Sequence, residues 1–235
     1  MTKLRRSFLA LFPIVAATSL AVAQTPVITQ ISTITTQQYQ TIVITGSNLG
    51  THAAYTGDSA YISFEDVTKD PIWQAGYSGY NDTITLIVHQ WEDTRIVLGG
   101  FSGAWGEYNY TIAVGDSIQV EVWNPQSGLG PAEITTTAVK EPTTTTLTSS
   151  PNPSADGAPV TFTADVTSKA GPPPNGETVS FQKGTTVLGT GTLSGGSAVF
   201  VTSALEVGKT SVIAVYKGDS HFGASKSAAV SQVVQ

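Results

Sequence analysis

Hydrophobic and polar residues alternate strictly between residues 160 and 167. Every second position is apolar and the positions between are polar: Val160, Phe162, Ala164 and Val166 against Thr161, Thr163, Asp165 and Thr167. Successive side chains of a strand point to opposite faces, so the pattern predicts a strand with one buried and one exposed face. Such a strand forms one wall of a sheet sandwich.

Short alternating runs recur through the rest of the C-terminal half. They begin near Gly176, Ser197 and Lys209, and Gly, Pro, Asn and Asp separate them. About seven short strands with turns at regular intervals are typical of a Greek-key sandwich of the immunoglobulin (Ig) type. We therefore predict one such sandwich over residues 143–235.

The N-terminal half shows the same period. Ile42 and Ile44 alternate with Thr41, Val43 and Thr45, and later in the chain Ile118, Val120 and Val122 alternate with Gln119, Glu121 and Trp123. The whole chain is therefore predicted to be all-β, as two tandem Ig-like β-sandwiches over residues 24–139 and 143–235. The Thr-rich stretch around Pro142 separates them, with residues 140–142 as a short, extended linker.

Several segments also carry a family resemblance. In the second half, PVTFTADV, VLGTGTL, SALEVGKTSVIAVYKGD and SKSAAVSQVV resemble bacterial Ig-like repeats of surface and secreted proteins. In the first half, ITGSNLGT, WEDTRIV and GDSIQVEVWNPQSGLGP resemble the IPT/TIG family of Ig-like folds. The resemblances imply a stackable spacer or adhesion module, preceded by a spacer or binding unit, without enzymatic activity.

Residues 1–23 have the pattern of a cleaved signal peptide. Lys3, Arg5 and Arg6 precede an apolar run, and Ala21-Val22-Ala23 forms a small-residue cleavage site. An uncleaved anchor helix is the alternative, but Pro13 interrupts the run. We expect a secreted, periplasmic or cell-surface protein without a transmembrane segment in the mature chain.

Charge divides the two halves. Residues 24–139 carry eleven acids and two bases, a net charge of −9, whereas residues 143–235 carry five of each. An acidic surface repels nucleic-acid backbones, so DNA and RNA are not expected as partners. The chain has no cysteine, which excludes disulfides and thiolate metal sites.

Aromatic residues gather between Tyr55 and Asp82. Exposed Tyr and Trp rings suit sugar rings and protein contacts, so we take Tyr61, Trp73, Tyr77 and Tyr80 as candidate ligand-binding residues. The expected ligand is an extracellular protein or a glycan. The alternative is that these rings are ordinary core at the ends of the sandwich.

The other polar residues give no site of recognised chemistry. Four acids of the same segment could gather around calcium, but no D-x-D-x-D-G pattern occurs, and solvated acidic loops are the simpler interpretation: Asp58, Asp66, Asp70 and Asp82. His52, His89 and His221 lie in different segments, and Glu92 and Asp93 would point to opposite faces of a strand. No catalytic residue, cofactor or metal is expected.

The sequence therefore predicts a non-catalytic Ig-like protein for adhesion, binding or spacing. Two alternatives stay open. The protein could be a carbohydrate-binding accessory to a separate enzyme, or a structural component of an envelope or matrix that assembles through sheet edges.

Overall fold

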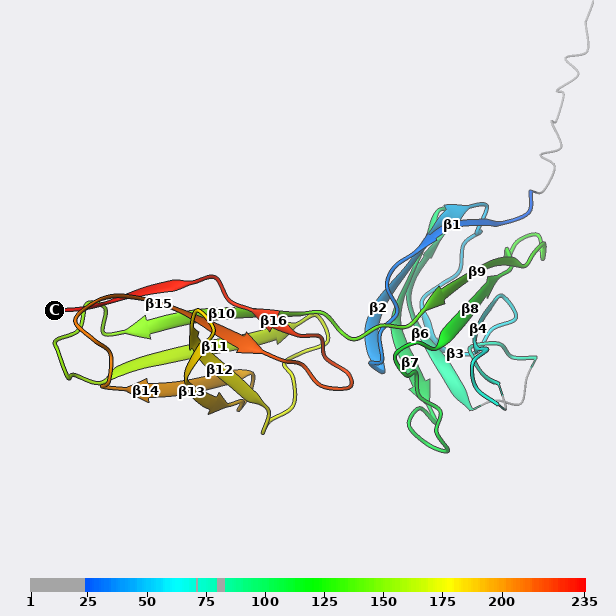
Figure 1. The fold of residues 1–235 in the computed structure, drawn as a ribbon. Helices are drawn as coiled ribbons and strands as arrows, with labels where there is room; N and C mark the ends of the chain where they lie inside the picture. Colours follow the sequence, from blue (N-terminus) through cyan, green and yellow to red (C-terminus); the bar gives the residue numbers. More distant parts are fainter. Residues whose placement is uncertain (1–23, 71, 80–82) are drawn as a thin grey trace, which may run out of the picture.

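A computed structural model describes residues 24–70, 72–79 and 83–235. The predicted signal peptide, residues 1–23, lies outside them. Every regular element in the described ranges is a β-strand, so the all-β class is confirmed, and no helix there is long and apolar enough to cross a membrane. Figure 1 shows two groups of strands, one before and one after the stretch near residue 140.

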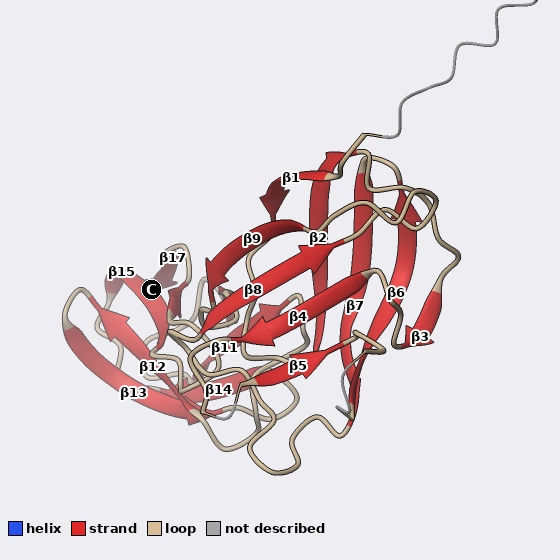
Figure 2. Cartoon of the chain, turned by 90° about the vertical axis from the view of Figure 1, so that its right-hand side faces the viewer, coloured by secondary structure: helices blue, strands red, loops and turns tan. Residues whose placement is uncertain are grey.

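Nine strands make up the first group. They are β1 Val27–Ile31, β2 Tyr39–Ser47, β3 Tyr55–Gly57, β4 Ile62–Asp66, β5 Trp73–Ala75, β6 Ile84–Glu92, β7 Arg95–Gly103, β8 Ser117–Val122 and β9 Ala132–Thr137. Hydrogen bonds connect them in the order β1-β2-β7-β6-β5-β4-β8-β9, with β3 beside β6. In Figure 2, β2, β7 and β6 run side by side while β9, β8, β4 and β5 cross them.

A single parallel bridge, Ala75 to Ile84, connects the layer ending in β6 to the layer ending in β5. The prediction had separate sheets in this half, whereas hydrogen bonds make one folded sheet. The physical reason is the short strand β5, which pairs with β4 on one side and touches β6 on the other. The two layers enclose one apolar core, in which Ile42, Ile44 and Phe64 are fully buried.

Eight strands make up the second group. They are β10 Thr143–Ser150, β11 Val160–Ser168, β12 Thr178–Lys183, β13 Thr186–Thr192, β14 Ser197–Thr202, β15 Gly208–Tyr216, β16 Ser225–Lys226 and β17 Val230–Val234. One sheet has the order β10-β11-β14, and the other has β13-β12-β15-β16 with β17 also beside β15. The predicted alternation in β11 is confirmed, because its four apolar side chains are all buried: Val160, Phe162, Ala164 and Val166.

Side chains from both sheets form the second core. Phe162 of β11 lies 6.3 Å from Phe181 of β12, measured between ring centroids, and Phe181 lies 5.5 Å from Phe200 of β14. All members of this core belong to residues 147–230, so it is built without side chains of the first group.

The connection between the two groups is short. Val139 donates its N–H to the carbonyl of Ile34 in the first group at 3.0 Å, whereas Glu141 donates its N–H to the carbonyl of His221 in the second at 2.7 Å. The Lys140 ammonium also bonds the Asp219 carbonyl. The change from one group to the other therefore takes place within one residue.

Candidate functional site

Two strands bring a pair of carboxylic acids together at one end of the first group. Strand β4 ends at Asp66, and Asp116 directly precedes β8, its antiparallel neighbour. The N–H of Ser117 donates to the Thr68 hydroxyl at 2.7 Å, which fixes the turn after β4 against the start of β8. Pairing thus places side chains fifty residues apart in the sequence in one cluster.

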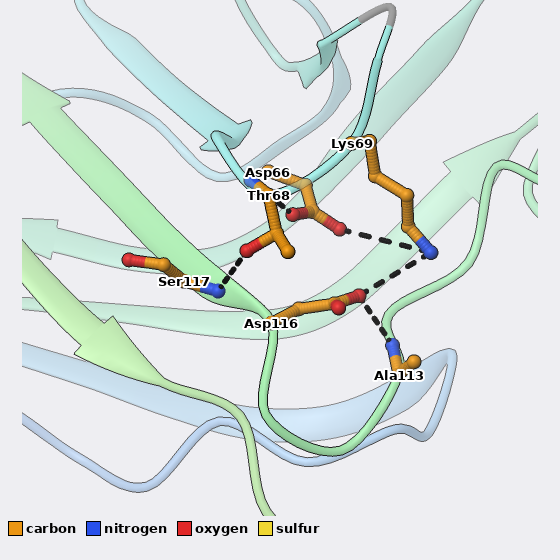
Figure 3. Close-up of polar contacts among 6 residues, drawn as sticks. All are labelled: Asp66, Thr68, Lys69, Ala113, Asp116 and Ser117. Atoms are coloured by element: carbon orange, nitrogen blue, oxygen red, sulfur yellow. Dashed lines mark hydrogen bonds and ion pairs between the residues drawn. The ribbon is translucent and has the colours of Figure 1, made fainter.

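Lys69 completes this cluster, which consists of Asp66, Lys69 and Asp116 (Figure 3). Its Nζ lies 3.3 Å from Asp116 Oδ2 and 4.0 Å from Asp66 Oδ2. The side chains of Asp66 and Asp116 are 0% and 10% exposed and that of Lys69 is 18% exposed. The ammonium therefore meets two carboxyl groups largely out of contact with water.

Backbone donors orient both carboxyl groups. The Thr68 N–H donates to Asp66 Oδ1 at 3.1 Å, and the Ala113 N–H donates to Asp116 Oδ2 at 2.7 Å. Asp66 Oδ2 is buried without a conventional hydrogen-bond partner among the described atoms. It lies on the side of Lys69, so it is placed to exchange a proton within the cluster (Figure 3).

The two acids titrate differently. Burial and the neighbouring carboxyl group of Asp116 raise the pKa of Asp66 from 3.8 to about 6. Burial would also raise the pKa of Asp116, but the Ala113 N–H, the neighbouring Asp66 carboxyl group and Lys69 outweigh it and lower that pKa. Like charges this close cannot both ionise freely, so one proton remains on the pair well above the usual range of a carboxyl group.

This cluster corrects the interpretation of the acidic residues as solvated loops. Asp58 and Asp70 are exposed as expected, but Asp66 ends a strand and is fully buried. Asp82 lies outside the described residues. No group of three or more His, Cys, Asp or Glu side chains suited to a metal ion occurs in the ranges the structure describes.

Trp73, one of the candidate ligand-binding residues, lies in the core. Its side chain is 4% exposed on β5 and packs edge-on against Phe101 and Trp105, with ring centroids 6.0 Å away in both cases. Its strand pairs with β4, which turns the indole inward. A ligand would not reach the face of this ring without displacing its neighbours.

Tyr61 and Tyr77 are half-buried and lie beside a third aromatic residue, Trp123. Tyr61 and Trp123 flank the paired residues Ile62 and Val122 on neighbouring strands, and Tyr61 also packs partly against the first core. The backbone N–H of Trp123 donates to the backbone carbonyl of Tyr61 at 2.8 Å. The Tyr77 ring stacks on the Trp123 ring, with 5.4 Å between the ring centroids. We call Tyr61, Tyr77 and Trp123 the aromatic patch.

Two further observations concern the aromatic candidates. Tyr80 lies outside the described residues, so its place relative to the aromatic patch is not described. The loop between β7 and β8 presents Tyr108, which is 85% exposed and was not among the predicted site residues. The Trp105–Tyr110 run of aromatic and Gly residues was the sequence signal that could have indicated it.

The residues weighed for catalysis lie apart or serve the fold. His52, His89 and His221 belong to a loop, to β6 and to the β15–β16 turn. Asp93 Oδ1 accepts the Gly50 N–H at 3.1 Å, and Asp219 Oδ1 accepts the N–H groups of His221 and Phe222. These carboxylates hold loops through hydrogen bonds from backbone N–H groups.

The strands and cores described above define an all-β protein. Residues 147–235 match the family of bacterial Ig-like domains, group 3. The resemblance stated for the second half is thereby supported, and this match covers none of the first half. No curated protein matches the chain.

Solved structures of modular proteins are similar to this chain at low identity. The fibronectin(III)-like modules of Clostridium thermocellum CbhA are 12% identical, with 89% of this chain and 94% of that chain covered and a TM-score of 0.33. The Escherichia coli adhesin FdeC is 13% identical, with 89% and 63% covered and a TM-score of 0.32. Domains A168–A170 of titin are 14% identical, with 89% and 65% covered and a TM-score of 0.35.

Proposed function

We propose that this chain is a non-catalytic Ig-like protein that works outside the cytoplasm, secreted, periplasmic or on the cell surface. Residues 24–139 form an IPT/TIG-like recognition module, residues 140–142 connect it, and residues 143–235 form an Ig-like spacer that carries it. The ligand is an extracellular protein or glycan.

The aromatic patch is the observation that supports recognition by the first module. Tyr61, Tyr77 and Trp123 are partly exposed, and the rings of Tyr77 and Trp123 stack, on a module whose net charge is −9. Stacked rings offer a flat apolar face with polar edges, which suits a sugar ring or the centre of a small protein contact. The second module has neither tryptophan nor a comparable group of tyrosines in its sequence.

Binding is tested with the full chain carrying Tyr77→Ala. We expect the variant to lose at least ten-fold in affinity for whichever glycan or cell-wall preparation the wild type retains, because the ring and its stacking on Trp123 are removed. Trp73 is left intact, since truncating a buried Trp costs about 3–5 kcal/mol and would confuse loss of folding with loss of binding. Glycan-array intensity and pull-down measure the effect.

Tyr39→Ala is the matched control. Tyr39 is 63% exposed at the start of β2, so this variant removes an accessible tyrosine elsewhere on the same module. Equal binding by the folded Tyr77→Ala protein and the wild type would refute recognition through the patch. Retention on insoluble polysaccharide would indicate the accessory role, and polymers that grow with concentration in light scattering the structural role.

A further inference from the structure

The cluster of Asp66, Lys69 and Asp116 has the composition of a condensation site. It combines an amine, a carboxyl group in contact with it and a second carboxyl group whose side chain is fully buried, all at one end of β4 and β8. We propose that Lys69 and Asp116 condense to an intramolecular isopeptide bond, with Asp66 transferring the protons. This modification is independent of the recognition function proposed above.

Proximity is the first requirement, and the structure meets it. Lys69 Nζ lies 3.3 Å from Asp116 Oδ2, so the carboxyl carbon is next to the amine. Holding an amine against a carboxyl group supplies part of the barrier reduction that proximity can give. The hydrogen bond that the Ser117 N–H donates to Thr68 Oγ1, at 2.7 Å, holds the two sides of the site together before any covalent link exists.

Protons balance within the cluster. Lys69 begins as an ammonium ion, and Asp116 and Asp66 both begin as carboxylates. Asp66 takes a proton from Nζ, the neutral amine attacks Cγ of Asp116, and the N–Cγ bond forms. One C–O bond then breaks, and its oxygen leaves as water with the two protons that nitrogen has lost. No oxidant, metal or external reactant is needed.

The surroundings favour each of these steps. Asp66 Oδ2 is buried, 4.0 Å from Nζ and without a conventional hydrogen-bond partner among the described atoms, so it is free to shuttle protons. The Ala113 N–H lies 2.7 Å from Asp116 Oδ2, within the range of an oxyanion donor, and stabilises the negative charge that develops there during attack. Limited contact with water also disfavours hydrolysis of the product.

The product would join the turn after β4 to the start of β8. The chain between the linked residues includes β5, β6 and β7, so the bond closes a loop around much of the first group. Closing a long loop lowers the conformational entropy of the unfolded chain. In a protein without cysteine, this cross-link would take the place of a disulfide.

Intact-mass measurement of the full chain tests the proposal. We expect the mass of the folded wild type to be lower, by the mass of one water molecule, than the mass calculated from the sequence starting at its observed N-terminus. A tryptic digest should contain a branched peptide in which Lys69 is joined to Asp116. Lys69→Arg retains the positive charge but removes the amine, so it should show the full mass and only linear peptides.

Asp66→Asn tests the proton-transfer step, because it keeps the shape and the acceptor for Thr68. We expect this variant to fold, as circular dichroism can verify, and to remain mostly unlinked. A full-mass, folded wild type with linear peptides would overturn the proposal. A mass loss that persists in Lys69→Arg would do the same, and linkage of Asp66→Asn at the wild-type rate would refute the role of Asp66.

Discussion

At the scale of single residues, the buried acid pair links the folding of the first module to pH. The pKa of Asp66 is raised from 3.8 to about 6, so between these values the unfolded chain has released a proton that the folded chain still binds. Stability contributed by this group is therefore greatest below its ordinary pKa and declines as pH rises towards 6. The lowered pKa of Asp116 acts in the opposite sense, but below 3.8, outside this interval.

Asp66→Asn should remove that decline. The amide remains uncharged at every pH. We therefore expect the stability of the variant, measured relative to that of the wild type, to be higher at pH 7 than at pH 4 by about 1–2 kcal/mol. Burial is the largest cause of the shift and acts whether or not Lys69 is linked, so the sign does not depend on the cross-link. Urea unfolding at several pH values measures it.

Asp70→Asn is the control for this measurement. Asp70 lies four residues further on and is exposed, so its replacement should leave the pH profile of unfolding parallel to that of the wild type. Parallel profiles for Asp66→Asn and the wild type would show that the buried carboxyl group does not retain its proton.

Residue-level chemistry was the part of the site that the sequence could not supply. Asp66 appeared as one of several acids in a segment rich in Gly and Asp, and average exposure of Asp predicts solvation. Its partner Asp116 is fifty residues away, and only the pairing of β4 with β8 brings them together. Similarly, nothing in the sequence around Trp73 distinguishes it from Tyr77, although one is buried and the other half-exposed.

At the scale of elements, strand β13 shows why a motif of the resemblance contains glycine. Gly189 and Gly191 lie on the face of β13 that meets β14. A Cβ on Gly191 would lie 2.6 Å from the carbonyl oxygen of Val199 and 2.9 Å from its nitrogen. The obstacle is backbone, which cannot move aside like a flexible side chain, so the close approach of the two strands requires glycine.

Gly191→Ala should therefore destabilise the second module. We expect a loss of about 1–3 kcal/mol, because the added methyl group forces β13 away from β14. Thermal and urea unfolding measure the change. Thr190→Ala, an exposed substitution on the same strand, is the control and should change stability by less than about 0.5 kcal/mol. Similar losses for the two variants would refute the steric explanation.

Alternation of apolar residues was sufficient to predict the long strands but not the short ones. Val212, Ala214 and Tyr216 of β15 are buried as the pattern indicates, and so are Ile118, Val120 and Val122 of β8. The segment from Tyr55 to Asp82 was expected to be rich in loops, yet it contains β3, β4 and β5. Three-residue strands exist only through their neighbours, so they leave too few positions for a period to appear.

At the scale of the whole molecule, the connector is part of the second module. Glu141 is 4% exposed, its carbonyl accepts the Gly223 N–H at 2.8 Å, and its carboxylate accepts the Ala170 N–H at 3.3 Å. Together with the bond to His221, these contacts fix Glu141 on the loops at one end of that module. Free rotation between the modules is therefore restricted to the few bonds around Lys140.

This arrangement leads to a prediction about fragments. A fragment of residues 140–235 should be more stable than one of residues 143–235, with a free energy of unfolding about 1–3 kcal/mol higher and a higher urea midpoint. The reason is that truncation leaves the backbone groups of His221 and Gly223 without their partners. Both contain the complete second core, so both should fold. Glu141→Gln in the longer fragment keeps the backbone bonds and should retain most of its stability. Equal unfolding midpoints for the two fragments would show that residues 140–142 are a free linker.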